Sequence, residues 1–142
     1  MYQKILVALD NSPPEQALLD HVARLAVRLQ SRLLLLHVAD GWVARNYDAL
    51  QLAESEEMKE DRAYLDQIAA RLRAQGIEVT TRLALGDPPQ EILKVAGEEN
   101  CDLIAMTTHG HRLVGDLLLG STIEAVRHQS HIPILVVRGA RP

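Results

Sequence analysis

The residues with most potential for chemistry follow two apolar segments of the sequence. Asp10 and Asn11 come directly after the run 5–9, and a glycine-containing segment, 108–120, follows the run 102–107. Uninterrupted aliphatic runs of this length are typical of parallel strands that are buried on both faces. Ligands of open parallel sheets bind beyond the carboxyl ends of the strands. We therefore expect both polar segments to border one binding site.

The glycine-containing segment has the parts that an anion site needs. Gly110 lets backbone amides approach a ligand closely. Gly120 and Ser121 open a predicted helix, whose free N–H groups and dipole favour a phosphate. Arg112 and His111 would supply positive charge. These features predict a site for a phosphorylated ligand.

A simpler interpretation of the same residues stays open. Residues 121–124 form a capping box, so Ser121 would serve only to cap a helix, and the glycines would be turn residues. The dinucleotide-binding fingerprint and the Walker loop are both absent from the sequence. Asp10 is either an ordinary helix-entry residue or a ligand of a ribose, with Mg²⁺ as a weaker candidate.

The elements that position these residues alternate between strand and helix. Their order predicts an α/β fold with a doubly wound parallel sheet and helices on both faces. The expected strands are 5–9, 33–38, 77–84, 102–107 and 132–137, and the expected helices are 12–29, 53–75, 88–99 and 121–128.

The helix boundaries have recognisable signals. Ser12 is the expected cap of the first helix, with Pro13 at its first position and Glu15 completing a capping box. Asp87 repeats this chemistry before Pro88 and Pro89. Gly76 is expected to end its helix in the left-handed conformation.

Composition narrows the function classes. The 142 residues predict one domain, 1–142, with a core that contains no Phe and a net charge of −4. Few aromatic residues argue against single-stranded nucleic-acid binding, and the mildly acidic charge gives no reason to seek DNA or an anionic membrane. The start lacks the features of a signal peptide, so we expect a cytoplasmic protein. Cys101 is expected to be a buried thiol and His37 a hydrogen-bonded core histidine.

Six segments carry a resemblance to a known family. In chain order, 4–12, 35–38, 85–88, 104–110, 118–121 and 133–138 resemble the universal stress protein family, and they cover essentially the whole chain. The resemblance implies a five-stranded sheet in the order 3-2-1-4-5. It also implies a homodimer formed through the last strand, 132–137.

Members of the family that bind ATP carry Gly, two residues, Gly, nine residues, then Gly with Ser or Thr. Gly110, the nine residues 111–119 and the pair Gly120-Ser121 match the latter part, whereas Thr107 stands where the first glycine belongs. A β-branched residue there would hinder ribose or phosphate contact if its side chain faced the ligand. The resemblance implies a site made of Ala8, Leu9, Asp10, Val38, Thr107, Gly110, His111, Arg112, Gly120, Ser121 and Thr122.

We therefore expect an ATP-binding regulatory protein, in which nucleotide orders the segment 111–119 of a homodimer. Magnesium with ATP is the expected form of the ligand, with ADP or AMP as alternatives. A nucleotide-free interaction module of the same fold is the second hypothesis, and Thr107 favours it. No catalytic base is evident, so an enzyme is not expected, although a very weak ATPase remains a third hypothesis.

Overall fold

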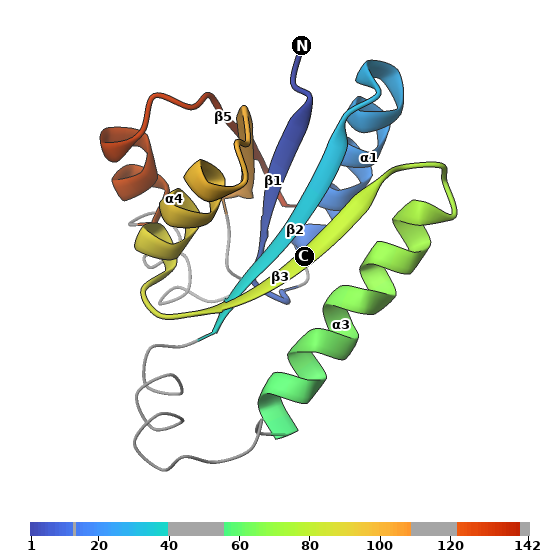
Figure 1. The fold of residues 1–142 in the computed structure, drawn as a ribbon, viewed down its shortest axis with the longest axis horizontal. Helices are drawn as coiled ribbons and strands as arrows, with labels where there is room; N and C mark the ends of the chain where they lie inside the picture. Colours follow the sequence, from blue (N-terminus) through green and yellow to red (C-terminus); the bar gives the residue numbers. More distant parts are fainter. Residues whose placement is uncertain (13, 40–55, 109–121, 140–142) are drawn as a thin grey trace.

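A computed structural model describes residues 1–12, 14–39, 56–108 and 122–139, which form a sheet of five parallel strands between helices (Figure 1). The strand order β3-β2-β1-β4-β5 confirms the predicted sheet. No described helix has the length and apolar character needed to cross a bilayer. The elements are β1 (Lys4–Leu9), α1 (Glu15–Leu29), β2 (Arg32–Ala39), α3 (Glu56–Arg73), β3 (Val79–Leu85), α4 (Pro88–Glu98), β4 (Leu103–Thr107) and β5 (Ile134–Val137), and residues 122–129 are also helical.

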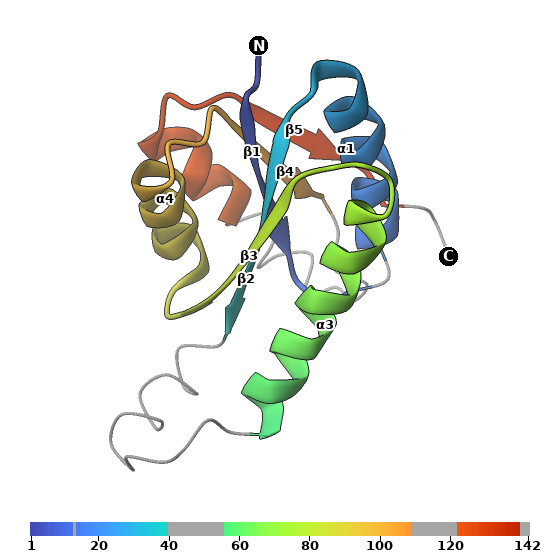
Figure 2. The same ribbon diagram turned by 45° about the vertical axis from the view of Figure 1, so that its right-hand side comes forward.

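Helices cover both faces of the sheet. Helices α1 and α3 lie on one face, and α4 and the helical residues 122–129 lie on the other (Figure 2). The strand residues alternate between two core clusters. Ile5 and Val7 belong to the cluster beneath α1 and α3, and Leu6 belongs to the cluster beneath α4; all three are fully buried. Residues 5–7 of β1 are apolar because water reaches neither face of the strand there.

The start of α1 differs from the sequence prediction, whereas α4 begins at Pro88 after Asp87 as predicted but without the side-chain cap. Pro14 is the residue that precedes α1, and no side chain caps the helix. The Ser12 hydroxyl instead donates to Asp10 Oδ1 at 2.5 Å, because a carboxylate two residues away is a strong acceptor. Pro13 lies outside the described residues. Asp87 does precede α4, but it accepts from the Glu91 amide through its backbone carbonyl and makes no side-chain cap.

Other boundaries move by a few residues. Strand β3 begins at Val79 and not at 77, because the Ile77 amide donates to the Leu72 carbonyl and closes the end of α3. Strand β5 begins at Ile134, after Pro133, whose nitrogen has no hydrogen to donate. The predicted helix 53–75 corresponds to α3. Residues 53–55 of the prediction lie outside the described part of the chain.

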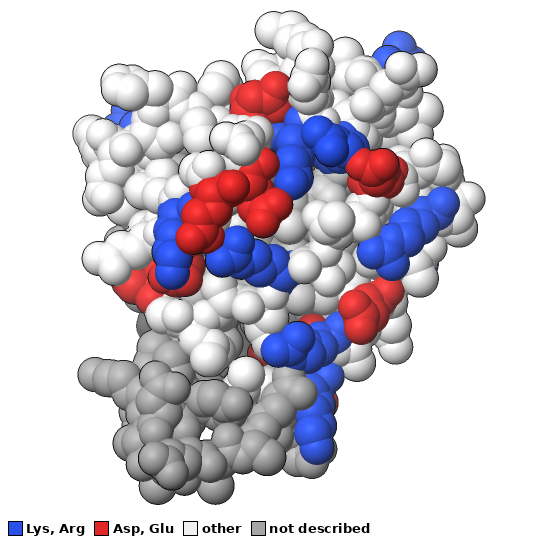
Figure 3. Space-filling view, in the orientation of Figure 1, with Lys and Arg blue, Asp and Glu red and all other residues white. Residues whose placement is uncertain are grey.

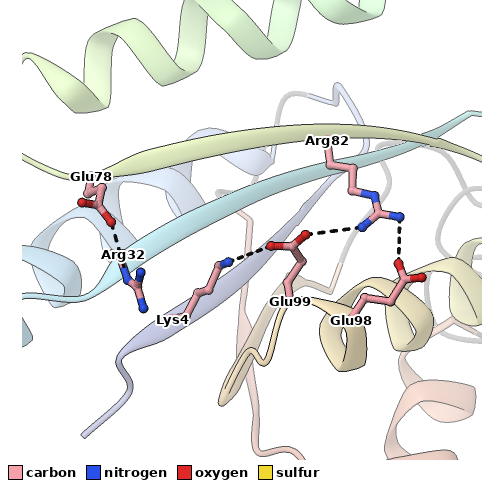
Figure 4. Close-up of polar contacts among 6 residues, drawn as sticks. All are labelled: Lys4, Arg32, Glu78, Arg82, Glu98 and Glu99. Atoms are coloured by element: carbon pink, nitrogen blue, oxygen red, sulfur yellow. Dashed lines mark hydrogen bonds and ion pairs between the residues drawn. The ribbon is translucent and has the colours of Figure 1, made fainter.

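A band of acidic and basic side chains crosses the α4 face of the sheet (Figure 3). Glu99 accepts from Lys4 Nζ at 2.8 Å and lies 3.6 Å from Arg82, which also contacts Glu98 at 2.8 Å (Figure 4). The hydrogen bond from Lys4 lowers the pKa of the Glu99 carboxyl. These ion pairs connect β1 and β3 to the end of α4.

The Asp102 side chain connects the starts of β1 and β4. Its two carboxylate oxygens accept from the amides of Gln3 at 2.9 Å and Lys4 at 3.0 Å, and its own amide donates to the Lys4 carbonyl at 2.9 Å. Three hydrogen bonds therefore fix the register of the two central strands at their amino ends.

Replacement of glycine by alanine is expected to have opposite effects on the free energy of unfolding at two positions. Gly76 has a φ of +86°, whereas Gly97 lies within α4, and an added Cβ meets no atom within 4 Å at either position. We expect Gly76→Ala to lower the free energy of unfolding by about 1 kcal/mol, since Ala disfavours left-handed backbone. Gly97→Ala should raise it by about 0.5 kcal/mol through helix propensity. Urea denaturation measures the change in the free energy of unfolding in each variant. Changes of the same sign in the two variants would contradict the assigned backbone conformations.

Candidate functional site

A cleft of about 210 Å³ opens at the carboxyl ends of β1, β2 and β4. This is the edge of the sheet where the chain leaves β1 toward α1 on one face and β4 leads to the opposite face, the usual place for a ligand in such folds. The residues that line the cleft are Ala8, Leu9, Asp10, Leu36, His37, Val38, Pro88, Ile92, Met106, Thr107 and Thr122.

The cleft combines apolar walls with a few polar groups. Leu36, Val38, Ile92 and Met106 give it an aliphatic surface, and Asp10 supplies a carboxylate at the end of β1. Sites for small organic ligands have this composition, in which apolar walls bind a flat or aliphatic body and isolated polar groups orient it. Among the described residues, no three His, Cys, Asp or Glu side chains group together as metal ligands would.

The structure brings six of the sequence-predicted site residues together. Five of them come from the ends of three separate strands, and the sixth begins the helical residues 122–129. These six are Ala8, Leu9, Asp10, Val38, Thr107 and Thr122. The other predicted residues, Gly110, His111, Arg112, Gly120 and Ser121, lie outside the described part of the chain.

The sequence interpretation missed the α4 side of the cleft. Pro88 and Ile92 line it because α4 begins where β3 ends, beside the carboxyl end of β2. The helix start after β3 was recognisable in the sequence, and it is the signal that would have placed these two residues at the site. His37 also lines the cleft, although its Nδ1 lies 2.9 Å from the Leu9 carbonyl, as expected for a hydrogen-bonded core histidine.

Strand alternation decides where the Thr107 side chain points. Leu103 and Ala105 belong to the core beneath α1 and α3, whereas Ile104 and Met106 belong to the core beneath α4. Thr107 continues the first set, so its side chain turns away from the face that carries Met106. It is 4% exposed, and its hydroxyl has no hydrogen-bond partner among the described residues. A β-branched residue here therefore leaves the Met106 side of the cleft open.

The turn between β1 and α1 has an unusual backbone. Asn11 has a φ of +57°, a left-handed conformation that is uncommon outside glycine but that asparagine tolerates. The Asn11 amide donates to Glu15 Oε2 at 2.9 Å, and Ser12 donates to Asp10. Glu15 thus reaches back to the residue before Ser12, which a simple capping box does not do.

A second layer of polar residues supports this turn from α3. The Tyr64 hydroxyl donates to Glu15 Oε1. The Tyr64 ring meets the His37 ring edge-on with centroids 6.1 Å apart, and His37 Nε2 lies 3.6 Å from Asp61 Oδ2. These residues form one cluster between α1, β2 and α3, directly behind the cleft wall.

Burial shifts the pKa of two side chains in this cluster, Glu15 and Tyr64. Glu15 is 7% exposed, and loss of hydration raises the pKa of its carboxyl, although the hydrogen bonds from Tyr64 and Asn11 act in the opposite direction. Burial and the neighbouring Glu15 also raise the pKa of the Tyr64 phenol. Cys101, elsewhere in the core, is a buried thiol whose pKa burial raises to about 11, so it is not reactive.

A larger hollow of about 610 Å³ lies at the amino ends of the strands, at the opposite end of the sheet from the cleft. It is open and mostly polar, and it is lined by residues such as Gln3, Gln30, Arg32, Gln75 and Glu78. Because it lies at the amino ends of the strands, it is not where this type of sheet binds ligands.

Comparison with known proteins places this arrangement in a family context. The sequence pattern Usp, described as the universal stress protein family, matches residues 1–138. The universal stress protein MJ0577 of Methanocaldococcus jannaschii is 29% identical over 155 residues, covering 97% of this chain and 96% of that protein. The solved structure of MJ0577 has a TM-score of 0.83 at 31% identity and covers 100% of this chain and 99% of that chain.

Two more solved structures share the fold and were determined with nucleotides. A universal stress protein in complex with cAMP has a TM-score of 0.70 at 22% identity, with 98% of each chain covered. A universal stress protein from Archaeoglobus fulgidus in complex with dAMP has a TM-score of 0.70 at 20% identity, covering 95% of this chain and 97% of that chain.

Removal of the buried carboxylate makes stability less dependent on pH. A raised folded-state pKa means that the folded protein holds the Glu15 proton more firmly than the unfolded chain, whose carboxyl has a pKa near 4.5. The associated stabilisation is complete below that value and is lost as pH rises through the folded-state pKa. We expect the melting temperature of Glu15→Gln, relative to the original protein, to rise between about pH 4 and about pH 8. A constant difference over this range would contradict the raised pKa.

Proposed function

The chain belongs to the universal stress protein family, and we propose that it is a nucleotide-binding regulatory member whose cleft takes an adenine nucleotide. The single observation that supports this most is the cleft at the ends of β1, β2 and β4. It offers a purine an aliphatic surface on the α4 side of the sheet, from Val38 and Met106, and it offers a ribose the Asp10 carboxylate as acceptor.

The relatives support the same ligand class. Two proteins of this fold were solved in complex with cAMP and with dAMP, both adenine nucleotides. Because their identity to this chain is 22% and 20%, the likeness is one of fold, and the residues of the cleft carry the main argument for adenine here. The Thr107 side chain turns away from the face of β4 that carries Met106, and this orientation supports nucleotide binding despite the missing glycine.

The phosphate groups are assigned to the segment that follows β4. Gly110, Gly120 and Ser121 match the glycine pattern of the ATP-binding members, and Arg112 would add positive charge. We propose ATP, with Mg²⁺, as the preferred ligand, and that its phosphates order residues 111–119. The protein then works as a nucleotide-controlled binding partner and not as an enzyme, since no residue of the cleft is evident as a base for water.

Calorimetry tests the proposed ligand directly. We expect titration with ATP and Mg²⁺ to give saturable heat, and Asp10→Asn to weaken the affinity about 10- to 100-fold through loss of a charged acceptor. Asp66→Asn, an exposed substitution on α3, is the matched control and should bind like the original protein. Parallel titrations with ADP and AMP rank the alternatives. If none of these nucleotides binds, and none is released on denaturation, the protein is the nucleotide-free module instead.

We also propose that the protein is a homodimer that pairs through β5. This strand is an edge of the sheet, and Val136 on it is 39% exposed, which leaves an apolar strand open to pairing. Val136→Asp should convert the dimer to a folded monomer, because the charge would be buried in the interface. Sedimentation equilibrium measures the mass and circular dichroism the fold. A protein that is already monomeric at micromolar concentration would contradict the proposal.

A further inference from the structure

We propose that Tyr64 and Glu15 form a strut that positions the β1–α1 turn, and with it Asp10, for the nucleotide, so that helix α3 is coupled to the cleft. The inference rests on the proposed function for its effect on affinity. Neither residue lines the cleft. Both are therefore positioning residues, and they act through the turn.

The turn needs such support because of its backbone. A left-handed conformation at a residue other than glycine costs free energy, and it persists only where its surroundings enforce it. At Asn11 the enforcing contact is the hydrogen bond from its amide to Glu15 Oε2 at 2.9 Å. Asp10 is the residue before Asn11, so the direction in which its carboxylate points depends on the backbone conformation of Asn11. Ser12, the following residue, holds the same carboxylate at 2.5 Å.

The other end of the strut is anchored in the core. Glu15 Oε1 accepts from the Tyr64 hydroxyl, so the carboxylate joins Asn11 on one side to α3 on the other. Tyr64 itself is held by its edge-on contact with His37. Its neighbour on α3, Leu65, is buried, so the helix cannot slide without loss of core packing.

The charged groups around Glu15 make its two donors more important. Asp10 raises the cost of a charge on Glu15, whereas His37 lowers it, and Asp61 lies on the far side of His37. If the Tyr64 hydroxyl is lost, the buried carboxylate keeps only the Asn11 amide as a partner in the described cluster. We expect Glu15 then to protonate or to turn toward water, which weakens its hydrogen bond from the Asn11 amide in the first case and breaks it in the second.

The first experiment compares two substitutions on the same face of α3. Tyr64→Phe removes only the hydroxyl, and we expect it to weaken nucleotide affinity about three- to tenfold in calorimetry. Ile68→Val removes one buried methylene group from the same helix. Ile68 belongs to the apolar core beneath α1 and α3 and is not part of the polar cluster around Glu15. This substitution should destabilise the protein while leaving affinity unchanged. Equal losses of affinity in the two variants, or none in Tyr64→Phe, would overturn the proposal.

The second experiment asks whether relief of the backbone strain restores binding. Asn11→Gly adopts the left-handed turn without steric cost, so the turn needs less support. We expect the double variant Asn11→Gly, Tyr64→Phe to bind more tightly than Tyr64→Phe alone. In addition, Glu15→Gln, which keeps an oxygen acceptor, should lose less affinity than Glu15→Ala. Absence of both effects would mean that Tyr64 acts only through general stability.

The third measurement needs no nucleotide and separates the strut from the proposed function. Hydrogen exchange followed by NMR should show faster exchange of the Asn11 amide in Tyr64→Phe than in the original protein, whereas Ile68→Val should leave the Asn11 amide unchanged relative to its neighbours. Faster exchange without nucleotide binding by the original protein would keep the strut and reject the ligand. Unchanged exchange at Asn11 would reject the strut itself.

Discussion

The structure depends on the burial of its central strand on both faces. Ile5, Leu6 and Val7 lose all contact with water, so β1 has no position at which a polar side chain would be tolerated without a partner. Chemistry is thereby restricted to the ends of the strands. At the amino end of β1, the amides of Gln3 and Lys4 are bound by Asp102, which fixes the strand register. The carboxyl end is left for a ligand. The place of the cleft follows from the packing of the sheet.

The same constraint explains why the cleft is built in two layers. A chain that leaves a buried strand has to turn within a few residues to reach a helix on one face, and the turn at Asn11 does so with left-handed backbone. The Asn11 amide donates to Glu15, and this acceptor is itself buried and requires donors. Each polar group is satisfied by the next, until the series ends at Tyr64 on α3. Helices α1 and α3 thus support a cleft that no described residue of either helix lines.

Most of the fold was predictable because the strand pattern is strong. Runs of aliphatic residues and the alternation with helices gave the class and the sheet, and the resemblance gave the strand order, which the structure confirms. The side-chain caps of α1 and α4 were predicted wrongly, since neither the Ser12 nor the Asp87 side chain caps in this tertiary context, although Asp87 precedes α4 and Gly76 has left-handed backbone as predicted. The contacts of Tyr64 with Glu15 and His37 could not be predicted, because they join residues far apart in sequence through a cluster with no local period. The orientation of Thr107 needed only the alternation of β4, once the faces of its neighbours were known.

The pairing of β1 with β4 has a consequence for how the protein is made. The Lys4 amide bonds to Asp102, 98 residues later, and β4 itself ends at Thr107. At about 5–20 residues per second, a ribosome takes roughly 5–20 s to extend the chain from one strand to the other. During that interval the apolar β1 has only β2 beside it, with its other edge unpaired. Strand β1, which lies at the centre of the finished sheet, is therefore the strand that stays longest without its second neighbour during synthesis. In that interval we expect it to be a binding site for a chaperone.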